Sequence, residues 1–467
     1  MADRCNIVYL HSHDTGRYVS PYGFAVDTPR LQALAERGVT FRHAFTANPT
    51  CSPSRACLLT GRYAHCNGML GLAHRGGRLS DPSQMMPHYL RSQGYDTAIA
   101  GFQHVTGGDE PRSMDELGYG VDLHDEPLDV EIDENETSVA QRDLATVARA
   151  ERFLDRRGEG DAPFFLDVGF FATHRTSTTE QGVQWHNGDA SPTGDGRYLR
   201  PPANLPDTAR TRADFADYAV AVNRLDDYMG RVLAAIESAG LAGNTLVICT
   251  TDHGIAFPRS KCYLTDHGTG VMLMLAGPAG GGHAFDGGRV SDALASHVDL
   301  FPTVCDAAGL PHPDWLQGHS LQPIAGDAEA RVRDEVHSEV NYHAAYEPKR
   351  TVRTDRYRYI RRLAVIDHPI LANTDPSESK ELLLDRGWND QPQVEEQLYD
   401  LTFDPQEACN RITDPAFAAV ADEMRGRLDR WMQSTDDPAL KGPVRLPGYE
   451  MNPVDARAPG PDTVTEK

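Results

Sequence analysis

Short apolar runs alternate with longer amphipathic segments along the first two thirds of the chain. The runs are typical of strands buried on both faces, and the amphipathic segments are typical of helices that cover a sheet. We expect strands at Asn6–Leu10, Val39–Phe45, Asp96–Ala100, Pro163–Phe171, Asn244–Thr251 and Val271–Ala276. We expect helices at Thr28–Arg37, Pro53–Thr60, Met85–Gln93, Ser138–Arg156, Ala213–Ser238 and His297–Ala308. This order predicts an α/β fold in which a large, mostly parallel sheet is sandwiched by helices.

The pattern changes after about residue 340. Arg350–Ala364 alternates like a strand, Gln397–Leu401 reads as a short strand, and Pro415–Gln433 is an amphipathic helix. We therefore expect a large domain over residues 1–345 and a small C-terminal α+β domain with an irregular tail over residues 346–467. Two segments are candidate exposed loops, Gly280–Gly288 and Asp375–Gln393.

The formal net charge of the chain is −23. Such a surface repels nucleic acid and anionic membranes, so we expect neither as a partner. It also repels a sulfated or phosphorylated substrate at long range. An enzyme of this composition that binds an anion must therefore concentrate positive charge in a pocket, and a lysine in a motif is informative because only five lysines occur.

The N-terminus lacks an apolar signal core, and no apolar run approaches the length of a membrane span. The eight cysteines contain no closely spaced CxxC pair. Reduced thiols and a cytoplasmic protein are the expectation, and a secreted protein from which a signal peptide has been removed is the alternative.

Two expected strands end in residues that bind metals. His13 and Asp14 follow the first strand, and Asp252 and His253 follow the strand at Asn244–Thr251. In a doubly wound sheet such strand ends converge on one edge. Carboxylates suit hard divalent cations, and imidazoles suit borderline ones, so these four residues are candidate ligands of one metal ion.

The most unusual local pattern is Cys51, followed by Pro53 and then Arg55. Pro53 is suited to the first turn of a helix. Cys51 then lies beside a helix N-terminus, where the backbone dipole favours a negative charge.

The segment Cys51–Gly61 resembles the site at which formylglycine-dependent sulfatases have a cysteine oxidised to an aldehyde. This family lies in the alkaline-phosphatase-like superfamily, whose fold the resemblance implies from Asn6 to about Asp436. Further segments are similar in matching order: Asp27–Ala35, Arg224–Asp227, Thr251–Gly254, Val298–Pro302 and Leu398–Glu407. Similarity to the heparan N-sulfatase (sulfamidase) branch depends on Cys51–Ala56, Asn67–Leu72 and Gly254–Pro258.

The resemblance implies a role for each candidate residue. Cys51 becomes formylglycine through a formylglycine-generating enzyme, and Arg55 holds the hydrate of that aldehyde. The metal positions, usually filled by calcium, are His13, Asp14, Asp252 and His253. The residues that face the sulfate and the leaving group are His104, His174 and Lys261. The substrate implied is a saccharide or small molecule that carries a sulfate ester or a sulfamate, and homodimers are common among such enzymes.

This chemistry explains why an aldehyde is useful. One hydroxyl of the hydrate attacks sulfur, and the other later collapses the intermediate and regenerates the aldehyde, which a plain serine or cysteine ester of sulfate could not do. A cation and positive side chains offset charge on the sulfate oxygens, and a histidine protonates the leaving group.

Two positions depart from the family pattern. The first metal position is commonly Asp and here is His13, and the usual Lys two residues before His104 is here Phe102. Calcium is the metal that the resemblance implies, and the imidazole of His13 leaves manganese or zinc as the alternatives. The missing lysine leaves open a second function, hydrolysis of phosphonate monoesters or phosphodiesters with the same aldehyde. A third alternative is a non-catalytic relative that uses the metal site for binding.

Substrate contacts are expected from arginines in loops. Arg175 and Arg259 are candidate contacts for a carboxylate or a sulfate, and solvated surface positions are the alternative. His74, Arg75 and His343 are further candidates for the lining of the substrate pocket.

Overall fold

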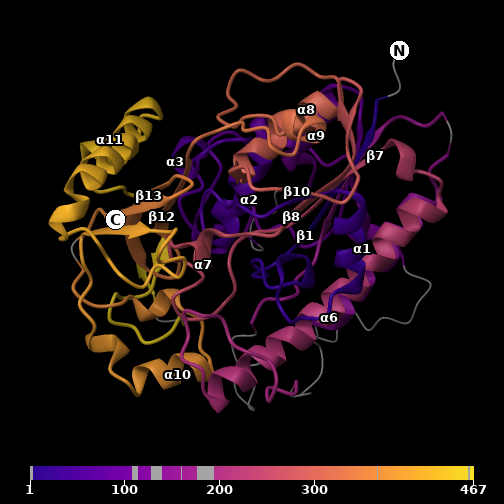
Figure 1. Cartoon of the computed structure of the whole chain (residues 1–467). Coiled ribbons are helices and arrows are strands. Elements are labelled where there is room, and N and C mark those ends of the chain that lie inside the picture. Colours follow the sequence, from indigo (N-terminus) through magenta and orange to yellow (C-terminus); the bar gives the residue numbers. More distant parts are fainter. Residues whose placement is uncertain are drawn as a thin grey trace.

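A computed structural model of the chain describes residues 4–107, 114–127, 139–158, 160–175, 194–364, 366–460 and 463–466. It has a large sheet with helices on both sides and a second, smaller sheet in the C-terminal part (Figure 1). The fold is therefore the α/β architecture that the sequence predicts. None of the helices in these ranges is long and apolar enough to cross a membrane.

The centre of the large sheet is β1 (Asn6–Ser12), which pairs in parallel with β6 (Phe164–Gly169) on one side and β7 (Thr245–Thr251) on the other. The strand order is β10-β2-β8-β7-β1-β6-β4-β5, and β9 pairs with β8. β8 runs antiparallel to both of its neighbours in this order, β2 and β7. The remaining strands of this sheet are β2 (Val39–Phe41), β4 (Asp96–Gly101), β5 (Val121–Asp122), β8 (Leu273–Gly280), β9 (His283–Phe285) and β10 (Arg289–Ser291).

Each face of the large sheet has its own core. Alternate side chains of β1 point to opposite faces, so that Ile7 and Tyr9 enter one apolar cluster while Val8 and Leu10 enter the other. Figure 1 shows α1 and α6 on one side of the sheet and α2 and α8 on the other. The helices around the sheet are α1 (Pro29–Arg37), α2 (Cys51–Thr60), α4 (Met86–Ser92), α5 (Val139–Asp155), α6 (Ala209–Ser238) and α8 (Leu300–Ala307).

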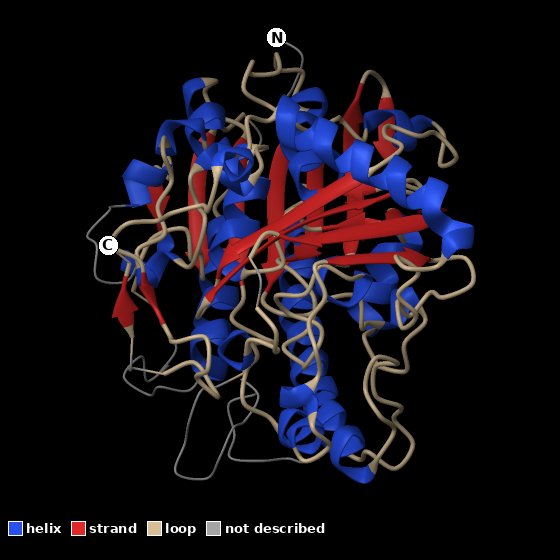
Figure 2. Cartoon of the chain, turned by 90° about the vertical axis from the view of Figure 1, so that its left-hand side faces the viewer, coloured by secondary structure: helices blue, strands red, loops and turns tan. Residues whose placement is uncertain are grey.

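The small sheet is antiparallel, with the order β12-β13-β14-β15, and helix α11 (Ala418–Ser434) packs on it. Its strands are β12 (Val336–Tyr342), β13 (Tyr346–Arg353), β14 (Tyr357–Arg362) and β15 (Glu396–Asp400). Figure 2 views this sheet with the large sheet behind it. Its first strand begins at Val336, ahead of the expected boundary at residue 345, and Cys57 of α2 shares its apolar cluster. The division into two domains stays a prediction.

Several expected elements differ in detail. The strand expected over Val39–Phe45 is divided between β2 and β3 (Ala44–Phe45), which belong to different sheets. Both segments expected to be loops contain regular structure: β9 in the first and α10 (Glu378–Leu384) in the second. Ser377 starts α10 by accepting a hydrogen bond from the Lys380 amide, a capping signal that the sequence interpretation passed over. The expected start of α5 at residue 138 lies outside the described ranges.

A buried ionic network ties the small sheet to the rest of the chain. Glu339 of β12 contacts His65 of α3 (Ala64–Asn67) at 2.8 Å and Arg350 of β13 at 3.4 Å. Arg350 also pairs with Asp437, which follows α11, at 2.6 Å. Burial alone would lower the pKa of His65, but the charge and hydrogen bond of Glu339, together with the interactions with Cys66, raise that pKa to about 10.

We predict that Glu339→Gln lowers the free energy of unfolding by about 3 kcal/mol, because it leaves Arg350 and His65 without their shared buried carboxylate. The folded pKa of His65 lies above its ordinary value of 6.5. The pair therefore stabilises the fold fully below about pH 6.5 and loses that contribution as the pH rises toward 10. Urea unfolding of both proteins from pH 6 to pH 10 should show the gap between them narrowing with pH. A gap that is constant over this range would contradict the assignment.

Candidate active site

The end of β1, the end of β7 and the start of α2 meet at one point. They bring together the side chains of His13, Asp14, Cys51, Asp252 and His253, all of them buried. One potential ligand atom from each residue lies within 4.8 Å of all the others. This buried group, called the ligand cluster below, unites the four predicted metal positions with the predicted nucleophile position.

The orientation of the His253 ring indicates that a cation fits this cluster. His253 Nδ1 lies 2.9 Å from the backbone oxygen of Gly254, which can only accept, so Nδ1 carries the proton. Nε2 lies 3.2 Å from Asp14 Oδ1 without a hydrogen bond to any described residue, and in the neutral ring it presents a lone pair there. Two acceptors at this distance repel each other unless a positive ion lies between them.

Two cationic side chains also reach the ligand cluster. Arg55 Nη2 lies 3.0 Å from Asp252 Oδ2, and Lys261 Nζ lies 2.9 Å from Asp14 Oδ2. Burial alone would raise the pKa values of both carboxyls. Lys261 foremost at Asp14, and the interactions with His13, His253 and Arg55 at Asp252, lower both pKa values below the usual range. Both acids are therefore ionised, and the positive charge that the net-negative chain requires is present at this point.

His174 and His104 lie beside the ligand cluster. The His174 ring contacts the His13 ring at 4.5 Å between centroids, and His174 Nε2 lies 3.9 Å from Asp14 Oδ2. His104 Nε2 lies 2.9 Å from Nδ1 of the exposed His74. Burial lowers the pKa values of His104 and His174. Both imidazoles are thus placed to exchange a proton with a group bound over the cluster.

The two departures from the family pattern are in contact with each other. The rings of His13 and Phe102 lie 5.2 Å apart between centroids, and Phe102 also packs on Phe171 at 4.4 Å. The Arg55 guanidinium lies 5.2 Å from the centre of the Phe102 ring. An imidazole and an apolar phenyl ring thus occupy the two positions at which the family pattern has a carboxylate and an ammonium.

The sequence interpretation missed the residues behind Arg55. Arg55 Nη1 lies 2.6 Å from His11 Nδ1, and His11 Nε2 lies 2.8 Å from Asp167 Oδ1. Asp167 also accepts a hydrogen bond from the Tyr119 hydroxyl. A signal was present, because a charged residue in the middle of an apolar strand, as Asp167 is in β6, needs a buried partner.

Asp375 and His343 were not assigned to the catalytic centre either. Asp375 Oδ2 lies 3.3 Å from Lys261 Nζ, which places Lys261 between two carboxylates, those of Asp14 and Asp375. The positive charge of Lys261 affects His343 as well, whose pKa is lowered first by burial and then by that charge. No local pattern marks Asp375, because its position depends on how the C-terminal part packs.

The two predicted substrate arginines have different surroundings. Arg175 is buried: its guanidinium lies 2.7 Å from Asp214 Oδ1 and donates to the Ala256 carbonyl. These contacts tie the end of β6 to α6 and give Arg175 a structural role in this conformation. Arg259 is exposed and lines a separate pocket with Asn204.

Comparisons with known proteins agree with this geometry. A sulfatase family model matches residues 5–310, and a model of the C-terminal part of N-sulphoglucosamine sulphohydrolase matches residues 261–393. Human N-sulphoglucosamine sulphohydrolase is 32% identical over 96% of this chain and 94% of its own length. The chain belongs to the sulfatase family.

Solved structures support the same fold. One is a complex of a protein with its substrate D-glucosamine-2-N,6-O-disulfate, with a TM-score of 0.68, 19% identity and coverage of 94% of this chain and 100% of that one. Another is the phosphonate monoester hydrolase of Agrobacterium radiobacter, with a TM-score of 0.66, 22% identity and coverage of 94% and 97%. At these identities the likeness establishes the alkaline-phosphatase-like fold alone.

Proposed function

We propose that this sulfatase hydrolyses the N-sulfate of an amino sugar in preference to a sulfate ester. The proposal is supported mainly by the position of the match to the C-terminal model of N-sulphoglucosamine sulphohydrolase. Residues 261–393, which match the N-sulphoglucosamine sulphohydrolase model, contribute both Lys261 and Asp375 to the neighbourhood of Asp14. The segment that matches the C-terminal part of that enzyme thus supplies two side chains beside the ligand cluster, and the human enzyme is 32% identical over 96% of this chain.

The proposed nucleophile derives from Cys51. Burial raises the pKa of its thiol well above the ordinary value, so the encoded side chain stays protonated and is a poor nucleophile. Oxidised to formylglycine, this position supplies a hydrated aldehyde, with one oxygen for attack on sulfur and one for release of sulfate. Because Cys51 is only 2% exposed, a formylglycine-generating enzyme must act before α2 packs against the sheet.

The residues of the ligand cluster fit a divalent metal. Asp14 and Asp252 provide carboxylate oxygens, and His253 provides the lone pair of Nε2. A bound metal would offset charge on the sulfate oxygens. With two imidazoles among four side chains, we propose manganese or zinc rather than calcium.

The remaining residues position charge and protons. Arg55 and Lys261 lie next to the carboxylates and present positive charge to an anion at Cys51. The leaving nitrogen of a sulfamate needs a proton, and His174 and His104 are the imidazoles beside the cluster. Burial, and after it the charge of Lys261, lowers the pKa of His174. A bound sulfate would offset the charge of Lys261 and so favour the protonated imidazole.

A phosphonate monoester or a phosphodiester is the alternative substrate. The same aldehyde, metal and cations would act on it, and Phe102 in place of the family lysine is the feature that favours it. The phosphonate hydrolase of similar fold is only 22% identical, against 32% for the N-sulphoglucosamine sulphohydrolase. The sulfamate therefore remains the better supported substrate.

Substrate choice tests the proposal directly. For protein produced together with a formylglycine-generating enzyme, we expect kcat/KM to fall in the order glucosamine N-sulfate, glucosamine 6-O-sulfate, aryl phosphonate monoester. Cys51→Ala should lower the first value at least about a thousandfold, because it removes the nucleophile. Cys409→Ala, at an exposed cysteine, is the matched control and should change nothing. A phosphonate monoester as the best substrate would refute the proposal.

Metal content tests the role of His13 without an activity assay. After equilibration with equal concentrations of calcium, manganese and zinc, we expect the wild-type protein to retain manganese or zinc over calcium. His13→Asp should shift the retained metal toward calcium at least about tenfold, because it adds a hard oxygen ligand. The same change at the exposed His283 is the control. The bound metals are measured by elemental mass spectrometry. If wild type and His13→Asp retain calcium, manganese and zinc in the same ratios, His13 is not a metal ligand.

A further inference from the structure

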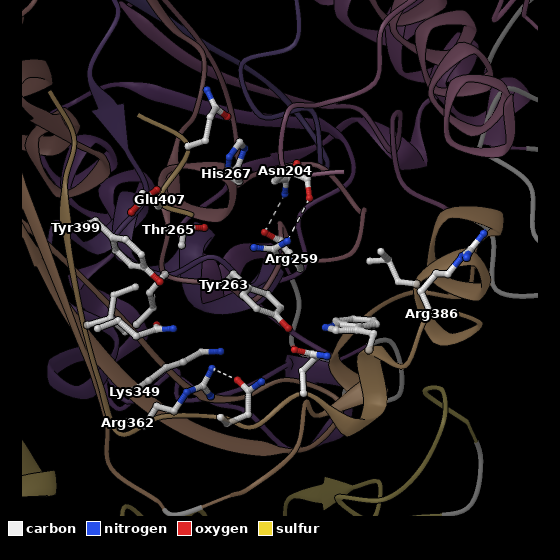
Figure 3. A pocket seen from close by; sticks show the side chains of 18 residues that line it. Asn204, Arg259, Tyr263, Thr265, His267, Lys349, Arg362, Arg386, Tyr399 and Glu407 are labelled. Carbon is white, nitrogen blue, oxygen red and sulfur yellow. Dashed lines mark hydrogen bonds between the residues drawn. The ribbon is translucent and has the colours of Figure 1, made fainter. Parts of the chain in front are cut away.

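A second pocket lies on the other side of the loop that carries Lys261. It has a volume of about 390 Å³ and is lined by Arg259, Tyr263, Leu264, Thr265 and His267 of that loop, by the small sheet and by the segment around α10. Figure 3 shows Arg259 on one side of the cavity and Lys349 and Arg362 on the opposite side, with Tyr263 between them. Its size is that of a pocket for a small ligand.

This pocket shares no lining residue with the ligand cluster. The two sites are separated by one loop, because Lys261 contacts Asp14 while its near neighbours Arg259 and Tyr263 line the pocket. Lys261 and Tyr263 are two residues apart, so their Cα atoms lie within about 7 Å. A ligand in the pocket would therefore bind close to the site of hydrolysis without occupying it.

The lining is cationic in a chain whose net charge is −23. Four basic side chains line the pocket, those of Arg259, Lys349, Arg362 and Arg386, against one carboxylate, that of Glu407. Glu407 is already paired with Arg358 at 2.8 Å. The positive charge of the lining thus exceeds the negative charge, which favours an anionic ligand.

The basic side chains differ in how far they are neutralised. Lys349 and Arg362 share Glu347, at 2.8 and 2.6 Å. Arg259 is exposed, forms no ion pair with a described carboxylate, and makes one side-chain hydrogen bond, to the Asn204 carbonyl at 3.5 Å. Arg386 is exposed as well and forms no ion pair with a described carboxylate. Arg259 and Arg386 are therefore the basic groups in this pocket that are most available to a ligand.

The uncharged part of the lining suits a sugar. Three aromatic side chains, those of Tyr263, Trp388 and Tyr399, offer faces and edges for packing against a pyranose ring. Five carboxamides can exchange hydrogen bonds with hydroxyl groups: Asn204, Gln391, Gln393, Gln397 and Gln406. Aromatic, amide and basic groups together match a sugar that carries a sulfate or a carboxylate.

We propose that this pocket binds an anionic sugar unit of the saccharide, beside the site at which sulfate is removed. The inference rests on the proposed saccharide substrate and adds to it a second binding site with Arg259 and Arg386 as its available charged contacts. Arg259 thus keeps the substrate role predicted from sequence, at a place separate from the reacting sulfate.

Calorimetric titration of the Cys51→Ala protein, which cannot turn over, tests the inference. The probe is a disaccharide of glucuronic acid and N-sulfated glucosamine, and we expect two binding sites per chain. Adding Arg259→Gln should weaken one site at least about tenfold and leave the other unchanged, and Arg386→Gln at the pocket rim should have the same effect in weaker form. Arg37→Gln, an equal charge change on α1, should leave both sites unchanged.

The outcomes separate this inference from the proposed function. If the wild-type protein hydrolyses N-sulfate but Arg259→Gln binds the disaccharide as before, the pocket is not a saccharide site. If the wild-type protein does not hydrolyse N-sulfate but Arg259→Gln still removes one of two disaccharide-binding sites, the saccharide pocket is supported. The proposed function is then refuted. If inorganic sulfate binds the pocket as tightly as the disaccharide does, the pocket recognises an anion and not a sugar. That result would refute the proposal of a saccharide site.

Discussion

The two buried carboxylates of Asp14 and Asp252 are the constraint on which the catalytic centre depends. Each is removed from water at the edge of the large sheet, and two unpaired negative charges there would cost several kcal/mol each. Lys261 and Arg55 offset them, and the lone pair of His253 turned toward Asp14 leaves a place that a cation fits. The charges thus make the site attractive to a metal and to an anion at the same time.

The fold creates this arrangement from distant parts of the chain. Parallel pairing of β1 with β7 aligns Ser12 with Thr251, so that the residues that follow each strand emerge side by side. Helix α2 starts at the same edge and points its first residue, Cys51, at them. The C-terminal part then covers Lys261 with Asp375 and forms a second, cationic pocket behind the same loop.

Much of this could be predicted from the sequence, and for a physical reason. Buried parallel strands read as apolar runs, and polar residues directly after them must lie at the sheet edge, which gave His13, Asp14, Asp252 and His253 their place. Contacts between distant segments have no such local pattern. Asp375 reaches Lys261 only because α10 packs as it does, and the partnership of His11 with Asp167 depends on the register of β1 with β6. The exposure of the two substrate arginines could not be predicted either, because no local sequence feature distinguishes the buried Arg175 from the exposed Arg259.

The central claim is that Cys51 is the precursor of an aldehyde nucleophile. The most direct measurement is the mass of the tryptic peptide His43–Arg55, taken from protein that hydrolyses N-sulfate and compared with inactive protein. The account predicts the mass decrease that follows when a CH₂–SH group becomes CHO, in a fraction that rises with specific activity. A fully active preparation in which this peptide carries only the unmodified thiol would contradict it.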